Sequence, residues 1–298
     1  MVARRATDTT VNLEVDLCGI ELTTPLIPAA GTLAKEALGE TVDAYGAVLP
    51  KTVTYFPRAG NPPPRLAEAP SGMVNSIGLQ NPGLERFLKG LDDYNMGIPI
   101  FVSIAADTID EFAEMCERLA KDKRVAAVEL NLSCPNVEHG GLSFCSSPRT
   151  VTEVVAACRV ALPNKPLFAK LTNEGVLANS VSAEEAGVDA LTLINTIPAL
   201  VVDTRERRVF LHGGLSGPAI KPIALRAVYE VSRVVEVPVT GCGGVTSGTD
   251  LAEFMLAGAK AVQVGAGSFV REPKKILEEF AFYLKENGLR AKDLTGFL

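Results

Sequence analysis

The chain of 298 residues contains no tryptophan, and only 6% of its residues are aromatic, although 47% are hydrophobic. We therefore expect a large core that is mainly aliphatic. No apolar run reaches the roughly 18 residues that a membrane-spanning helix needs. The arginines near the N-terminus are not followed by an apolar segment, so residues 1–10 predict a frayed arm rather than a secretory signal.

Basic charge and histidine are also scarce. The formal net charge is −6 and the pI is about 5.2, which argues against a protein that presents a basic face to RNA or DNA. The only histidines, His139 and His212, are each followed by a glycine pair and form no metal-binding set. A histidine-based metal site or catalytic base is therefore not expected.

Paired cysteines are absent as well. The six cysteines are scattered and none lies in a CxxC pair: Cys18, Cys116, Cys134, Cys145, Cys158 and Cys242. This spacing predicts free thiols in a reducing cytosol and gives no support for a zinc site or an iron–sulfur cluster in this chain.

What the sequence does contain is a regular alternation of strand and helix patterns. Short strands rich in Val, Leu, Ile and Ala are expected at residues 25–31, 47–54, 99–106, 125–133, 166–171, 189–196, 237–244 and 261–267. Helices are expected up to about residue 45 and at 108–121, 151–162, 177–186, 223–235, 248–257 and 273–287.

Eight such units without a change of rhythm predict a (β/α)8 barrel, with residues 1–298 forming one domain. A doubly wound open sheet is the alternative. Residues 12–24 alternate apolar and polar side chains around Gly19, which predicts a hairpin before the first unit. That hairpin could close the N-terminal end of the barrel.

Three connections, at residues 55–82, 135–147 and 197–221, are too long for ordinary turns. Each follows a strand, so in a barrel each lies on the C-terminal face, where barrel enzymes bind their substrates. Long loops in compact domains are commonly lids or binding loops. We expect all three to border a site.

Glycines gather after the last two predicted strands. They are Gly241, Gly243, Gly244, Gly265 and Gly267. At this position barrels commonly bind phosphate through backbone N–H groups. The alternative is tight turns that need positive φ.

Two lysines, Lys51 and Lys170, end predicted strands and could act as Schiff-base nucleophiles or as charges for an anion. Alternatively, they extend from the barrel rim to solvent.

Cys134 is the candidate reactive residue. It follows a buried strand pattern and is flanked by Asn131, Ser133 and Asn136. A thiol must have a lowered pKa, or lose its proton in a concerted step, to act as a base at neutral pH. The other five cysteines are interpreted as small core residues.

The segment NLSCPN, residues 131–136, resembles the active-site loop of class 1 dihydroorotate dehydrogenases, which are FMN-containing (β/α)8 barrels. SGMVNSIGLQNPG (71–83) is similar to the substrate loop of that family. GGLSGPAIKPIALR (213–226) and AGAKAVQVGAG (257–267) are similar to its later segments. The GLSGPAIKP form resembles class 1B, the NAD-linked branch.

The resemblance implies oxidation of dihydroorotate to orotate in pyrimidine synthesis, with Cys134 as the base and FMN as the hydride acceptor. Ser133 would orient or relay the proton. The implied substrate-binding residues are Lys51, Asn75, Ser76, Ile77, Gly78, Leu79, Asn131, Asn136, Asn195 and Thr196. The implied FMN-binding residues are Ala30, Gly31, Lys51, Thr52, Asn131, Lys170, Gly217, Gly243, Gly244, Gly265 and Ala266.

The resemblance also implies a second subunit that carries FAD and a [2Fe–2S] cluster, in a heterotetramer of two of each subunit built on a homodimer core, in the cytoplasm. The alternatives are a fumarate-linked class 1A enzyme, a reductase of dihydropyrimidines or of tRNA dihydrouridine, and a non-enzymatic flavin-binding scaffold. The sequence departs from the family pattern at Asn173-Glu174, at Ala266 and at residues 197–203.

Overall fold

The computed structural model describes residues 11–33, 35–133 and 144–298. Its central sheet contains seven parallel strands in the order β3-β13-β12-β9-β8-β7-β6. Their bounds are β3 Leu26–Pro28, β6 Ile100–Ile104, β7 Val125–Asn131, β8 Leu167–Leu171, β9 Ala190–Leu193, β12 Val239–Cys242 and β13 Ala259–Val264.

Residues 47–54 close this sheet into a barrel. Parallel bridges join Val48 to Ile100 and Val53 to Ile104 at the β6 edge. At the β3 edge, Gly46 N donates to Leu26 O over 2.9 Å. The predicted (β/α)8 barrel is therefore confirmed, with its second strand reduced to isolated bridges.

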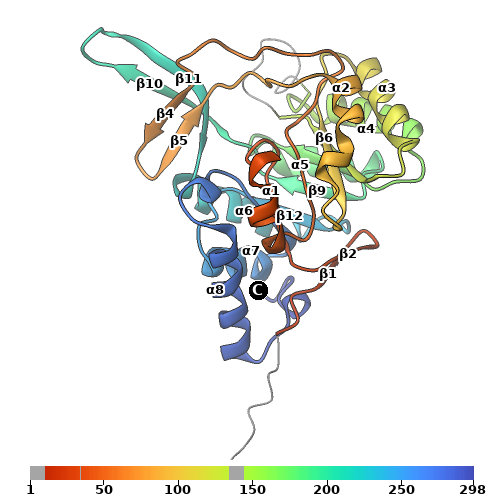
Figure 1. The fold of residues 1–298 in the computed structure, drawn as a ribbon, viewed down its shortest axis with the longest axis vertical. Coiled ribbons are helices and arrows are strands. Elements are labelled where there is room, and N and C mark those ends of the chain that lie inside the picture. The colour runs from red at the N-terminus through yellow and green to blue at the C-terminus, as the bar shows by residue number, and fades with distance from the viewer. Residues whose placement is uncertain (1–10, 34, 134–143) are drawn as a thin grey trace, which may run out of the picture.

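Helices surround the barrel (Figure 1). Their bounds are α1 Leu38–Thr41, α2 Leu84–Lys89, α3 Ile109–Ala120, α4 Pro148–Ala161, α5 Val176–Glu185, α6 Lys221–Val231, α7 Gly248–Leu256 and α8 Pro273–Asn287. Single 3-10 turns lie at Lys35–Ala37, Val42–Ala44, Leu91–Tyr94, Pro218–Ile220, Ala266–Phe269 and Ala291–Asp293. In the described part of the chain, no helix combines the length and apolar character needed to cross a membrane.

Capping residues fix where these helices begin. The Thr108 side chain accepts from Glu111 N at the start of α3, and Ser147 likewise accepts from Thr150 N at the start of α4. Ser247 and Asp250 form a reciprocal capping box at the start of α7. From α3 to α8, the observed bounds lie within a few residues of the expected ones. The helix expected before residue 45 is divided into α1 and two 3-10 turns, and α2 was not expected.

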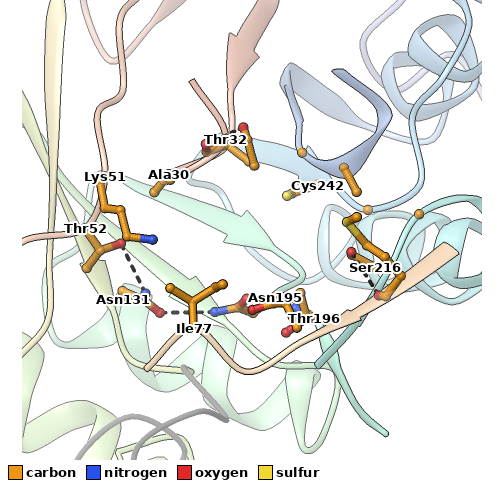
Figure 2. A pocket seen from close by; sticks show the side chains of 18 of the residues that line it. Ala30, Thr32, Lys51, Thr52, Ile77, Asn131, Asn195, Thr196, Ser216 and Cys242 are labelled. Atoms are coloured by element: carbon orange, nitrogen blue, oxygen red, sulfur yellow. Dashed lines mark hydrogen bonds between the residues drawn. The ribbon is translucent and has the colours of Figure 1, made fainter. Parts of the chain in front are cut away.

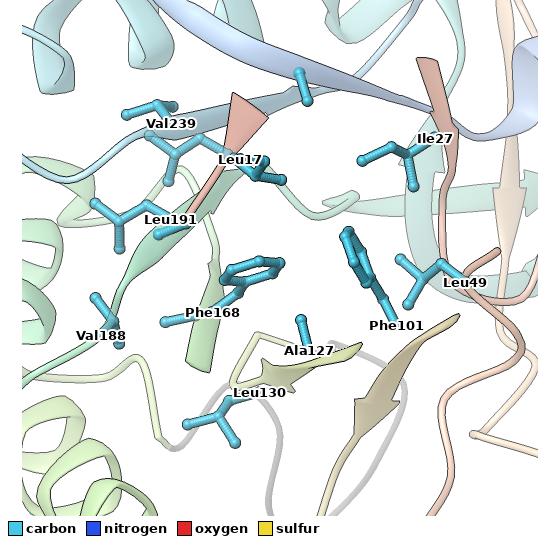
Figure 3. Packing of buried hydrophobic residues seen from close by; sticks show 14 of the residues in the cluster. Leu17, Ile27, Leu49, Phe101, Ala127, Leu130, Phe168, Val188, Leu191 and Val239 are labelled. Atoms are coloured by element: carbon cyan, nitrogen blue, oxygen red, sulfur yellow. The ribbon is translucent and has the colours of Figure 1, made fainter. Parts of the chain in front are cut away.

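Buried hydrophobic side chains fill the barrel interior (Figure 3), and the interior becomes polar further along the strands. Phe101 and Phe168 pack edge to face, with ring centroids 5.5 Å apart. Two residues further along β6 and β8, Ser103 and Lys170 point the same way because side chains alternate along a strand. Both are buried. A polar layer therefore lies between the aromatic core and the C-terminal face.

The predicted N-terminal hairpin is confirmed as β1 (Val15–Leu17) paired with β2 (Ile20–Leu22). Cys18 Sγ donates to Asp189 O, 3.1 Å away, just before β9 begins. Leu17 is buried among the core residues (Figure 3). The hairpin therefore lies at the N-terminal end of the barrel, as expected.

Two of the three long connections contain strands, so their description as loops was wrong. Strands β4 (Leu66–Ala69), β5 (Gly72–Asn75), β10 (Ile197–Asp203) and β11 (Arg208–Ser216) form an antiparallel sheet in the order β10-β11-β5-β4. This sheet projects beyond the barrel (Figure 1).

The glycines in this sheet obscured the strand pattern in the sequence. A Cβ on Gly213 would lie 2.2 Å from Asn75 O, so the close approach of β11 to β5 requires glycine there. The third connection falls largely on residues 134–143, outside the described residues.

Candidate active site

A cavity of about 560 Å³ lies on the C-terminal face of the barrel, between the strand ends and the antiparallel sheet. Nearly all described residues of the predicted substrate and cofactor sets line it (Figure 2). They are Ala30, Gly31, Lys51, Thr52, Asn75, Ile77, Gly78, Leu79, Asn131, Lys170, Asn195, Thr196, Gly217, Gly243, Gly244, Gly265 and Ala266.

Of the described residues in the implied substrate and cofactor sets, Ser76 is the one that does not line the cavity. Ser76 belongs to the predicted substrate loop, but its hydroxyl accepts from Asn61 Nδ2 over 3.0 Å. The neighbours Asn75 and Ile77 do line the cavity. Cys134 and Asn136 lie outside the described residues, so their predicted roles stay predictions.

A set of polar side chains joins three strand ends at the cavity. Asn195 Nδ2 donates to Asn131 Oδ1 and to Ser133 Oγ, over 3.1 Å each. Asn131 Nδ2 in turn lies 3.4 Å from Thr52 Oγ1, which is hydrogen-bonded to Ser103. These contacts orient each amide and present a fixed pattern of donors and acceptors to a small polar ligand.

The Ser133 hydroxyl is committed to the fold. It is fully buried, and its proton is donated to Lys170 O over 2.9 Å while its oxygen accepts from Asn195. A hydroxyl has a single proton to donate. Ser133 therefore holds the chain in place just before Cys134, and its described contacts do not support a proton relay.

Lys170 lies on the floor of the cavity and is only 6% exposed. Its Nζ donates to Gln263 Oε1 over 2.7 Å and lies 3.6 Å from Cys242 Sγ. Burial lowers the pKa of Lys170, but its interactions with Cys242 and Glu129 offset burial, and the net pKa is raised. The ammonium is therefore a fixed positive charge that an anion or an anionic ring can contact.

Lys51 provides a second amine that lines the cavity. A Cβ on Gly31, whose φ is +87°, would lie 3.2 Å from Lys51 Nζ. The glycine therefore makes room for the lysine beside the loop after β3.

The turn after β12 is shaped by two glycines with positive φ. A Cβ on Gly244 would lie 2.9 Å from Gly217 O, and one on Gly243 would lie 2.7 Å from the Ala224 side chain. Asp250 holds the far end of this turn, because its Oδ2 accepts from Thr246 N over 2.8 Å. The turn therefore requires glycine at both positions, and both glycines line the cavity.

Several cavity residues were not anticipated. They are Arg65, Met73, Gln80, Ser216, Ile220, Cys242 and Phe269, among others. Cys242 was interpreted as a core residue; it is only 7% exposed, yet it also lines the cavity beside Lys170. Its place between Gly241 and Gly243 at a strand end was the available signal. No group of metal-binding side chains occurs among the residues that the structure describes.

Comparison with known proteins agrees with this geometry. Residues 12–284 match the family model described as dihydroorotate dehydrogenase. The chain is 43% identical over 300 residues to "Dihydroorotate dehydrogenase B (NAD(+)), catalytic subunit" of Pelobacter propionicus, covering 96% of this chain and 98% of that protein. It is 40% identical over 301 residues to the protein of the same name from Maridesulfovibrio salexigens, covering 97% and 98%.

A solved structure supports the fold. The crystal structure of DHODH from Eimeria tenella in complex with ferulenol superposes with a TM-score of 0.82, at 24% identity, covering 99% of this chain and 91% of that one. The resemblance noted in NLSCPN and the later segments is thereby confirmed, including its similarity to the B type. The chain belongs to the dihydroorotate dehydrogenase family.

Proposed function

We propose that this chain is the catalytic subunit of an NAD-linked dihydroorotate dehydrogenase and oxidises dihydroorotate to orotate in pyrimidine biosynthesis, with residues 1–298 forming one domain. The observation that carries the proposal is that Asn75, Asn131 and Asn195 meet the buried Lys170 in one cavity. Relatives that this chain covers almost completely carry that enzyme's name.

The substrate is small, planar and anionic, and the cavity offers matching groups. In this proposal Lys51 binds the carboxylate, while the amides of Asn75, Asn131 and Asn195 bind the ring. Hydrogen bonds between the amides fix their orientation in advance, which reduces the entropy lost on binding. Thr196, Asn136 and the backbone of residues 76–79 complete the proposed substrate site.

FMN is the cofactor that the family implies, and the residues present fit it. Gly243, Gly244, Gly265 and Ala266 line the cavity with exposed backbone and at most a methyl side chain, which leaves N–H groups accessible to a phosphate. The buried Lys170 ammonium lies where it could contact the flavin ring. Gly31, Ala30, Thr52 and Gly217 complete the proposed cofactor site.

Bound FMN would accept a hydride from the substrate. The chain's own part is to hold the substrate, exclude water and remove a proton. We assign proton removal to Cys134, which directly follows the buried Ser133. Asn131 and Ser133, both tied to Asn195, set the direction in which the chain leaves β7.

A partner subunit is part of the proposal, with FAD and a [2Fe–2S] cluster on the partner and two of each subunit around a homodimer core. The β10–β11 hairpin supports an interface, because it exposes Leu200, Val202 and Val209 by 50–54%. The described cysteines are free thiols, which supports the proposed cytoplasmic location.

The decisive experiment is an anaerobic titration of the FMN-reconstituted chain. Dihydroorotate should bleach the flavin absorbance, and NADH alone should not. The proposal would be contradicted if the chain took up no FMN, or if the bound flavin stayed oxidised after dihydroorotate was added.

Co-purification of an iron–sulfur flavoprotein tests the proposed partner. Rapid fumarate reduction by the isolated chain would instead favour the fumarate-linked class.

A further inference from the structure

Glu129 is a buried carboxylate that the proposed function does not use. It lies in β7, two residues before Asn131, so its side chain points into the barrel one layer below the cavity. It is 1% exposed. Both of its donors, Thr192 Oγ1 at 2.9 Å and Gln263 Nε2 at 2.7 Å, bind the same oxygen, Oε2. Glu129 Oε1 has no hydrogen-bond partner among the described residues.

Gln263 connects this carboxylate to the cavity floor. Its Nε2 donates to Glu129, and its Oε1 accepts from Lys170 Nζ over 2.7 Å. A glutamine amide can occupy such a site in two orientations, but an ionised carboxylate can only accept hydrogen bonds. Glu129 therefore fixes the amide with its NH2 group inward and its oxygen toward Lys170.

Glu129 also supplies charge. Lys170 has two neighbours that could balance its ammonium, Cys242 and, through Gln263, Glu129. Burial raises the pKa of the Cys242 thiol, which favours its neutral form. Glu129 is therefore the neighbour whose carboxylate can balance the ammonium, through Gln263. A buried ammonium without a compensating charge is costly to maintain. Glu129 offsets that cost through an amide, without the direct ion pair that would draw Nζ away from the cavity.

We propose that Glu129 and Gln263 are positioning residues that hold the Lys170 ammonium against the cavity floor and so favour the reduced, anionic form of the bound flavin. The inference rests on the proposed binding of FMN. Glu129 and Gln263 are not among the residues that line the cavity, whereas Lys170 is. In this proposal their effect passes through Lys170.

The experiment compares the FMN reduction potential and FMN affinity of the reconstituted parent chain with those of Glu129→Gln, Gln263→Met and Lys170→Met. The first variant removes the charge and leaves Gln263 free to turn. The second keeps both charges and breaks the connection between them. We expect both variants to lower the FMN reduction potential, as Lys170→Met should also do. The expected change is at least tenfold in the ratio of the FMN and reduced-FMN dissociation constants, or about 30 mV for a two-electron couple.

Glu117→Gln is the matched control, because it makes the same chemical change on the exposed face of α3. It should leave the potential unchanged. A rise in potential in Glu129→Gln would overturn the proposal, since it would mean that the carboxylate acts directly on the flavin. An unchanged potential in Gln263→Met would overturn the connection through the amide. A parent chain that binds no FMN would count against the proposed function instead.

Discussion

The side-chain amide of Asn195 donates to Asn131 Oδ1 over 3.1 Å, which joins the end of β9 to the end of β7 inside the cavity. Because this contact occupies Asn131 Oδ1, the NH2 group of Asn131 faces Thr52. The two asparagines therefore act as one unit, and changing either should disturb the other.

Asn195→Ala should raise the KM for dihydroorotate more than it lowers kcat. Loss of about 1.5–3 kcal/mol of hydrogen bonding corresponds to about 10- to 100-fold in binding. Steady-state kinetics at several substrate concentrations measure this effect. Asn287→Ala is the control, because Asn287 donates only to Tyr283 O at the exposed end of α8. An unchanged KM in Asn195→Ala would remove the residue from the substrate site.

Gly244→Ala should weaken FMN binding by more than tenfold. Its φ is +78°, and the added Cβ would lie 2.7 Å from the Lys221 Cβ and 2.9 Å from Gly217 O, so the turn must move. Flavin fluorescence titration of the apoprotein measures the affinity. Gly288→Ala is a matched control, since Gly288 has a φ of +65° and open space around its Cβ position. The control should lose about 1 kcal/mol of stability and bind FMN as before.

Cys134→Ser should cut turnover severely at neutral pH and recover part of it as the pH rises. A hydroxyl holds its proton far more tightly than a thiol, whose reference pKa is about 8.5, so the serine needs more alkaline conditions to act as a base. The pH profile of kcat for parent and variant measures this. Activity equal to that of the parent at neutral pH would exclude Cys134 as the base.

Acid should weaken the fold partly through Asp250. Burial raises the pKa of this carboxyl, but Lys221 and the Thr246 N–H more than offset burial, and the net pKa is lowered. A carboxyl with a lowered folded-state pKa stabilises the fold fully above its unfolded value of about 3.9. That stabilisation is lost as the pH falls through the lower, folded-state value.

Asp250→Asn should therefore flatten the pH dependence of the unfolding free energy below about pH 4. Urea denaturation at a series of pH values measures this dependence. Asp43→Asn, at an exposed aspartate, serves as the control. Parallel acid profiles for Asp250→Asn and the parent would show that the ion pair with Lys221 contributes nothing measurable.

The barrel was predictable because its strands are short apolar runs separated by amphipathic helices, a pattern carried by local sequence. The hairpin of β10 and β11 could not be predicted, because its stability depends on pairing with β5, which is far away in the chain. Gly213 and Gly214 weaken the local strand signal at the point where the backbones approach.

The candidate site was predictable where a residue ends a strand, as Lys170 and Asn195 do. The site could not be predicted where it depends on polar residues inside a strand. Glu129 and Gln263 interrupt apolar runs, but the sequence does not show that their side chains meet across the barrel. Ser76 illustrates a further limit, since alternation along the chain turns it toward Asn61 while its neighbours face the cavity.

The pairing of β5 with β11 also has a consequence for how the chain folds. Asn75 and Gly214 are 139 residues apart, and four of the barrel strands, β6 to β9, lie between them. Contacts of such large sequence separation form slowly, because the closure entropy of a long loop must be overcome first. The pairing of β3 with β13, which closes the barrel, joins residues still farther apart in the chain. Both pairings should therefore form late, and a newly made chain should acquire its ligand-binding capacity only in the last stage of folding.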